Sequence, residues 1–187
     1  MASTTSNRMK DASPDDGRAR DVIAVMVFGE LEGICHVLLS WNHYAREYQL
    51  VSAEVSPADA ADAGSCARCV IGLRVSPAAA ALLSYAHMAR FSNCIVLCGE
   101  VCAGGDGDLI EELKAHNERN SIRMEYLPAE DLPYHADLDR LEWVPLDELL
   151  EHPASHEGYR VQGVGEVIDA LGRDALARFS SAAVHVC

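Results

Sequence analysis

Short apolar runs separated by polar turns dominate the first third of the chain. Val22 to Phe28 form a β-branched and aromatic run that ends at Gly29, and comparable runs occupy residues 34–41 and 47–52. Runs of this length, bounded by turn residues, are typical of buried strands. The pattern therefore predicts three strands before any helix.

From residue 56 onward the pattern becomes helical. Ser56-Pro57 is a typical helix start, and good helix formers continue to Gly72. Ser76-Pro77 predicts a second helix over residues 76–90, although its apolar residues also fit a short buried segment. A third helix is predicted over residues 108–118, where an aspartate is followed three residues later by a glutamate in a capping-box pattern.

The remaining elements alternate along the chain. Apolar runs predict strands over residues 91–102 and 121–127, and prolines interrupt the segment 128–139. A further strand and helical turn are predicted over residues 141–153, and an amphipathic helix over residues 166–179. This order predicts an α/β domain with a mixed sheet covered on both faces. No glycine-rich loop of the Rossmann or Walker type follows a strand, which excludes those two nucleotide sites.

Composition narrows the class of protein. The chain has 187 residues, enough for one domain with a core, and we expect residues 21–187 to form it. Its 29 acidic and 15 basic residues give a net charge of −14, which disfavours extended binding to a nucleic-acid backbone or to an anionic membrane surface. No apolar run reaches the roughly 20 residues that a membrane-spanning helix needs.

The first 20 residues and the cysteines bear on the compartment. Residues 1–20 lack the apolar stretch of a secretion signal, and we expect them to be a flexible leader. Seven cysteines, an odd number, favour a reducing compartment, either cytosol or nucleus. Cys66 and Cys69 have the spacing of zinc and redox motifs, but without a second ligand pair we expect buried free thiols.

Two local segments carry a family resemblance. Residues 141–150 read Leu-Glu-Trp-Val-Pro-Leu-Asp-Glu-Leu-Leu, a strand with an inward tryptophan and a proline that opens a helix. Residues 47–55 place an aromatic and a short strand before the first helix. With the order of elements over residues 21–175, these segments resemble the Nudix family, which implies an α/β/α sandwich with a mixed sheet.

The resemblance also implies a 23-residue signature over residues 53–75, and most of its acidic positions are missing here. Asp59 stands at the first glutamate position, but Ala67 and Arg68 replace an arginine and a glutamate, and Ile71 and Gly72 replace the paired glutamates. In the family these carboxylates hold Mg²⁺, a cation that prefers oxygen ligands. The resemblance therefore implies a degenerate catalytic helix.

Two functions follow from the resemblance. The first is a noncatalytic module that binds a nucleotide, a capped-RNA-like ligand or a protein partner, with Trp41, Tyr48 and Glu54 as the expected ligand-binding residues and no cofactor. Aromatic side chains gather near the first strands, where Phe28 and Tyr44 join them, and such rings can stack on a base; ordinary core packing is the alternative.

The second function is a divergent hydrolase of nucleoside diphosphates linked to another moiety. It requires Mg²⁺ held by acids from outside the usual set, for which the metal candidates are Asp59, Asp62 and Glu100. A chance match of layout, with another mixed α/β fold, is the third alternative.

Overall fold

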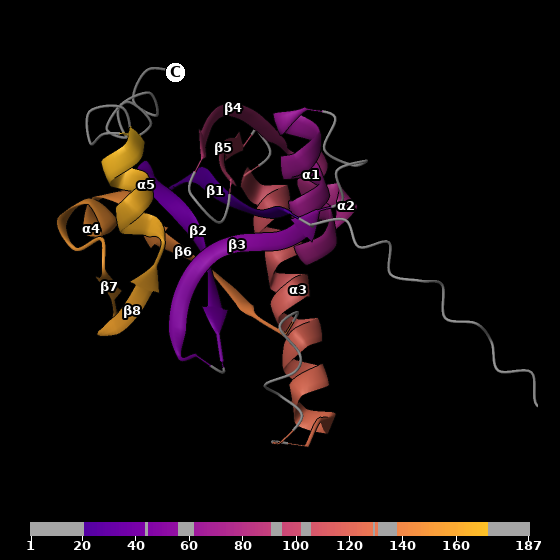
Figure 1. Cartoon of the computed structure of the whole chain (residues 1–187). Helices are drawn as coiled ribbons and strands as arrows, with labels where there is room; N and C mark the ends of the chain where they lie inside the picture. Colours follow the sequence, from indigo (N-terminus) through magenta and orange to yellow (C-terminus); the bar gives the residue numbers. More distant parts are fainter. Residues whose placement is uncertain are drawn as a thin grey trace, which may run out of the picture.

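The computed structural model describes residues 21–43, 45–55, 62–90, 95–101, 106–128, 130 and 138–171. Within them the chain forms eight strands and five helices (Figure 1). The strands are β1 (Asp21–Leu31), β2 (Ile34–Asn42), β3 (Glu47–Val55), β4 (Leu83–Arg90), β5 (Ile95–Val101), β6 (Arg140–Pro145), β7 (Ser155–His156) and β8 (Tyr159–Gln162). The helices are α1 (Ala63–Arg74), α2 (Pro77–Ala81), α3 (Asp106–Tyr126), α4 (Leu146–Glu151) and α5 (Val164–Leu171).

The strands form one mixed sheet in the order β4-β5-β1-β2-β3-β8-β7, with β6 paired to the free edge of β2. The pairs β1–β5 and β3–β8 are parallel, and the other pairs are antiparallel. β1 pairs with β2 through its second half and with β3 through its first half. The long strand β3 therefore pairs with β2 through its first half and with β1 through its second half.

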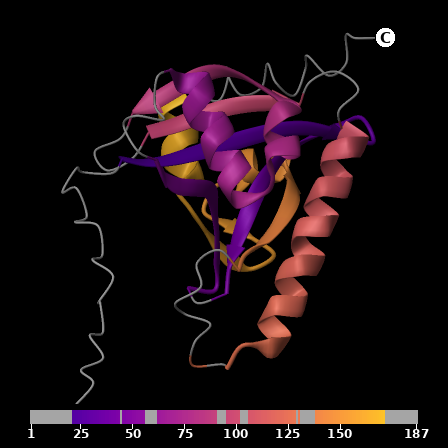
Figure 2. The same ribbon diagram turned by 90° about the vertical axis from the view of Figure 1, so that its right-hand side faces the viewer.

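Helices cover both faces of the sheet, because alternate residues of the central strands are apolar on both sides. Ile23, Val25 and Val27 of β1 pack into one buried cluster with α1, α2 and α3. The intervening Met26 and Phe28 pack into a second cluster with α4 and α5. Figure 2 looks onto the first face, where α1 lies over the sheet and α3 runs past its edge. The predicted α/β/α sandwich with a mixed sheet and three leading strands is confirmed.

Two predicted elements were wrong. Residues 121–127, expected to be a strand, continue helix α3 to Tyr126. The helix persists because His116 and Asn120, four residues apart, are both buried against the start of β6. The helix expected over residues 76–90 ends at Ala81, and residues 83–90 form β4 instead. Antiparallel pairing with β5 overrides the helix propensity of this segment.

Other expectations differ only in their boundaries or lie outside the described residues. Helix α1 begins after Asp62, and residues 56–61 are not described. The predicted leader, residues 1–20, and the end of the last predicted helix, from residue 172, also lie outside the described part of the chain. Among the described residues, no helix combines the length and apolar character needed to cross a membrane.

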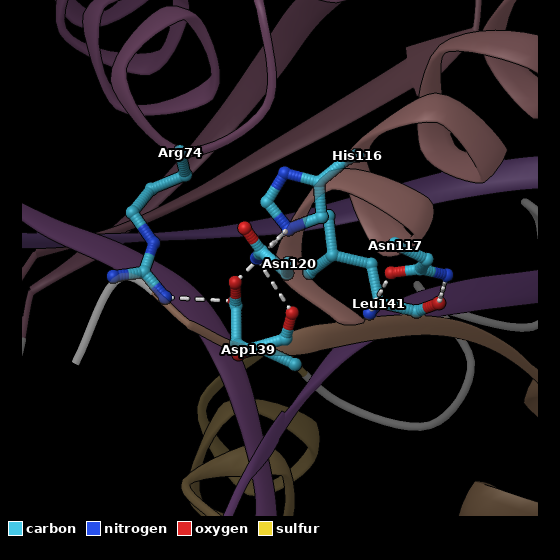
Figure 3. Close-up of polar contacts among 7 residues, drawn as sticks. Arg74, His116, Asn117, Asn120, Asp139 and Leu141 are labelled. Carbon is cyan, nitrogen blue, oxygen red and sulfur yellow. Dashed lines mark hydrogen bonds and ion pairs between the residues drawn. The ribbon is translucent and has the colours of Figure 1, made fainter. Parts of the chain in front are cut away.

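A buried polar network joins four elements on the α1–α3 face (Figure 3). Asp139, which is 3% exposed, accepts hydrogen bonds from Ser40 Oγ at 2.5 Å and from Arg74 Nη2 at 2.7 Å. His116 Nε2 lies 3.0 Å from Asp139 Oδ1, and Asn120 donates to the Asp139 carbonyl oxygen at 2.9 Å. These bonds fix the start of β6 against β2, α1 and α3.

Two neighbouring contacts extend this anchoring. Asn117 both donates to and accepts from the backbone of Leu141, at 3.0 and 2.9 Å. Trp143 packs against the first core cluster, and its ring covers Gly29, where an added Cβ would lie 2.9 Å from the ring. The inward tryptophan expected from the sequence is therefore confirmed.

Candidate functional site

A row of side chains crosses the face of the sheet that carries α4 and α5. Trp41 of β2 stands directly opposite Arg140 of β6 on one side and Tyr48 of β3 on the other, and Tyr48 in turn stands opposite Val161 of β8. Residues paired directly across strands point to the same face. The register alone therefore brings a guanidinium and two aromatic rings together.

A cavity of about 210 Å³ opens over this row, and we call it the aromatic pocket. It is lined by Trp41, His43, Tyr48, Arg140, Glu157 and Tyr159. The Trp41 ring lies 4.8 Å from the Tyr48 ring at 59° and 4.7 Å from the Tyr159 ring at 72°, centroid to centroid. Trp41 contacts both tyrosine rings, and because Tyr48 is 2% exposed, the ring surface open to the pocket belongs mainly to Trp41 and Tyr159. Its size suits a single ring system or a small cationic group rather than a whole dinucleotide.

The hairpin β7–β8 supplies the outer wall. Its turn consists of Glu157 and Gly158, whose φ angles of 50° and 78° are both in the left-handed region. Two such residues in succession match the type I′ turn favoured in two-residue hairpins. The turn sets Glu157 and Tyr159 beside the rings of β2 and β3, while the buried Val161 ties the hairpin to the core.

Hydrogen bonds and ion pairs orient the residues around the pocket. The Tyr48 hydroxyl donates to Glu142, and Arg140 forms an ion pair with the same carboxylate. His156, whose ring lies 5.1 Å from the Tyr48 ring, is held by Glu148 through a 2.6 Å contact at Nδ1. Tyr48 is 2% exposed, so its ring position is set by packing as well as by this bond.

The pKa values of two residues that line the pocket, Tyr48 and His43, shift in opposite directions. Burial raises the pKa of Tyr48, and the charge of Glu157 raises it further, against a smaller opposing effect of Arg140. Burial lowers the pKa of His43, and the Arg140 charge adds to that effect, while Asp139 opposes it. The negative charge of Glu157 thus acts on Tyr48, and the positive charge of Arg140 acts on His43.

The structure brings together two of the three expected ligand-binding residues. Trp41 and Tyr48 contact each other and line the aromatic pocket. Glu54 is exposed at the far end of β3, about 20 Å of strand from Tyr48, and does not line it. Phe28 is buried in the core, and Tyr44 lies outside the described residues.

The metal candidates do not converge on one point in the described structure. Asp59 lies outside the described residues, and no side chain is described for Glu100, whose backbone pairs with Phe28 and Ser84. The Asp62 carboxylate caps α1, accepting from the Ser65 amide and hydroxyl at 2.8 Å each, and these bonds lower its pKa.

Helix α1 itself does not fit Mg²⁺. Its 12 residues include no aspartate or glutamate, Ile71 is 1% exposed within the core, and Gly72 has no side chain. Within the described residues, no group of three or more histidine, cysteine, aspartate or glutamate side chains could hold a metal ion. A hard divalent cation requires convergent oxygen ligands, which this helix does not offer.

Sequence reasoning missed several residues of the pocket, namely Arg140, His43, Glu157 and Tyr159. A turn signal was present in Glu157-Gly158, but the flanking residues, Ser-His before it and Tyr-Arg-Val-Gln after it, are mostly polar and do not have the apolar pattern of a hairpin. Of the cysteine pair, Cys66 is buried and Cys69 is partly buried, and both are free thiols, as expected.

Comparisons with known proteins give structural neighbours only. No protein-family model matches the chain, and no curated protein matches its sequence. Among solved structures, the chain is similar to the NUDIX domain of Shewanella oneidensis NrtR complexed with ADP ribose, at 10% identity and a TM-score of 0.46, covering 89% of this chain and 94% of that one. It covers 63% of a longer NrtR structure, at 10% identity and a TM-score of 0.43.

Two further neighbours show the same degree of likeness. One is the C. elegans Ap4A hydrolase, at 9% identity, a TM-score of 0.45 and coverage of 87% and 98% of the two chains. The other is the C-terminal domain of mouse MUTYH in complex with human PCNA, at 10% identity, a TM-score of 0.41 and coverage of 82% and 87%. All four TM-scores lie below 0.5, so these neighbours carry no argument about this chain.

Proposed function

We propose that this chain is a ligand-binding module whose aromatic pocket holds the ring of a nucleotide or of a similar small ligand. The observation that supports the proposal is the direct contact of Trp41, Tyr48 and Tyr159 around one cavity that also contains Arg140. Aromatic side chains stack on bases of any sequence, at about 1 to 3 kcal/mol per base.

Arg140 gives the proposed site a partner for phosphate. Its side chain is 56% exposed, and it stands beside Trp41 at the edge of the pocket. A guanidinium can contact phosphate oxygens while it keeps its ion pair with Glu142, because it presents five donors. The ring of the ligand would lie against the aromatic side chains, and its phosphate would reach toward β6.

Titration calorimetry with the four nucleoside monophosphates tests this function. In the Tyr159→Leu variant we expect a loss of affinity of roughly 5- to 100-fold, because one stacking wall is removed. Tyr159 is 39% exposed, so the fold should tolerate the change. The matched control is Tyr126→Leu, which removes a tyrosine that is 82% exposed at the end of α3 and should leave affinity unchanged. If folded wild-type protein binds none of the four, an unmodified nucleotide is excluded as the ligand.

The divergent hydrolase remains the competing function, and its support is the family resemblance alone. It predicts Mg²⁺-dependent release of monophosphates from dinucleotides and sugar nucleotides, with loss of activity on Asp59→Asn. The lack of carboxylates on α1 favours binding over this chemistry. Turnover that depends on Asp59 would replace the binding proposal, whereas a protein partner that competes with nucleotide for the pocket would extend it.

A further inference from the structure

The aromatic pocket carries opposite charges on its two sides. Arg140 lies on β6 at one side, and Glu157 lies in the β7–β8 turn at the other. Arg140 already pairs with Glu142, whereas Glu157 makes no hydrogen bond or ion pair with any other described residue. The Glu157 carboxylate is therefore available to a ligand.

Glu157 occupies a backbone position that glutamate rarely takes. At a φ of 50° it stands at the first central position of a type I′ turn, where asparagine, aspartate and glycine are preferred. Glu32 has the same conformation in the β1–β2 turn, at a φ of 54°, so the left-handed backbone belongs to the hairpin turn and does not by itself mark a ligand site. Here the turn sets a free carboxylate at the mouth of a cavity walled by aromatic rings.

The rings are arranged as walls rather than as one flat platform. Tyr48 and Tyr159 are both steeply inclined to Trp41, at 59° and 72°. The rings touch one another, so a ligand contacts the outer surfaces of Trp41 and Tyr159 rather than a space between them. A cation against such a ring face is stabilised, because the face carries the negative part of the ring quadrupole. A neutral base can stack on the same surface but lacks this attraction of charge.

The negative charge around the pocket also favours a cation. The charge of Glu157 acts on the Tyr48 hydroxyl more strongly than the opposing charge of Arg140 does, and it raises the Tyr48 pKa in the same direction as burial. The net charge of −14 also attracts cations to the molecule as a whole.

From these observations we infer that the aromatic pocket selects a small ligand with an alkylated, positively charged nitrogen, held against Trp41 and Tyr159 beside Glu157, and an anionic group held by Arg140. The inference rests on the proposed function and names the charge of the bound group. Two compounds share this chemistry: a nucleotide with an N-alkylated base, and the phosphate ester of a quaternary ammonium alcohol.

Matched ligand pairs test the inference by calorimetry. N7-methylguanosine monophosphate is compared with guanosine monophosphate, and phosphocholine with its neutral carbon isostere, 3,3-dimethylbutyl phosphate. We expect at least one cationic member to bind about tenfold more tightly than its neutral partner, and the pair that shows the preference identifies the source of the ligand. Equal affinity within both pairs would overturn the inference while leaving the proposed function intact, and no binding of any compound would overturn both.

The Glu157→Gln variant tests whether Glu157 is the residue that selects the cationic ligand. This variant should reduce the preference for the cation to less than threefold. Glu151→Gln, which removes an exposed carboxylate at the end of α4, is the matched control and should keep the full preference. A preference that survives in Glu157→Gln would contradict the role assigned to this residue.

Discussion

Asp139→Asn offers the most direct test of how the sheet is anchored. The substitution keeps the size of the side chain and removes its charge. Asp139 accepts from Ser40 and Arg74 through one oxygen and contacts His116 through the other. An amide has a single acceptor oxygen, so in either orientation the side chain loses an acceptor, toward His116 or toward Ser40 and Arg74.

The structure sets the size of the expected loss. A hydrogen bond to a charged group contributes about 1.5 to 3 kcal/mol, and a neutral one about 1 kcal/mol. Breaking a buried ion pair by removing one partner costs about 3 to 5 kcal/mol. Arg74 is 14% exposed, so water relieves part of this cost. We expect the variant to lose about 3 kcal/mol of unfolding free energy.

Equilibrium unfolding in urea at pH 7, followed by circular dichroism, measures the loss. Asp108→Asn, which changes an exposed aspartate near the start of α3, is the matched control and should change stability by less than about 0.5 kcal/mol. A loss below about 1 kcal/mol for Asp139→Asn would refute the view that the network anchors β6.

The pH dependence follows from the same residue. Burial alone would raise the pKa of Asp139, but hydrogen bonds from His116 and Ser40 and the charge of Arg74 together lower it. A carboxylate whose folded pKa is below its unfolded value stabilises the fold above the unfolded value, about 3.9, and this contribution is lost as the pH falls toward the folded pKa. The stability difference between wild type and Asp139→Asn should therefore narrow below about pH 4.

Four further outcomes are expected. Gly29→Ala should destabilise the fold by about 1 to 3 kcal/mol in urea unfolding, because its Cβ would lie 2.9 Å from the Trp143 ring. Ile71→Glu, which restores a signature glutamate, should abolish cooperative thermal unfolding, because this side chain is 1% exposed. Ser76→Ala should cost about 1 kcal/mol, since the Ser76 hydroxyl caps α2 at the Ala79 amide, and calorimetric melting would register it. Burial raises the pKa of Cys66, so mass spectrometry should find this thiol slow to react with iodoacetamide in the folded protein.

The strands that hydrophobic runs define could be predicted from the sequence. The segments whose secondary structure depends on contacts with residues far along the chain could not. The runs of β1, β2 and β3 are apolar because their side chains lie in the core, so periodicity alone located these strands. The apolar run over β5 located that strand in the same way. The segment 83–90 and the end of α3 have ambiguous local patterns, and their structures depend on pairing with β5 and on bonds to Asp139. Such long-range contacts leave no local signal.

The candidate site was predictable to a similar extent. Aromatic residues in neighbouring strands indicated Trp41 and Tyr48, because adjacent strands place such residues side by side. Arg140 and Glu157 could not be assigned, because the first depends on the register of β6 against β2 and the second on a parallel pairing between β3 and β8.

The attachment of the β7–β8 hairpin has a mechanical consequence. The hairpin joins β3 through only two paired positions, Tyr48 with Val161 and Gln49 with Gln162, whereas β2 and β6 share six. One wall of the cavity therefore rests on strand pairing, whereas the other rests on two side-chain anchors, the buried Val161 and the contact of His156 with Glu148. Removal of either anchor would displace Glu157 and Tyr159 from the rings of β2 and β3 and leave the pairing of β2 with β6 intact.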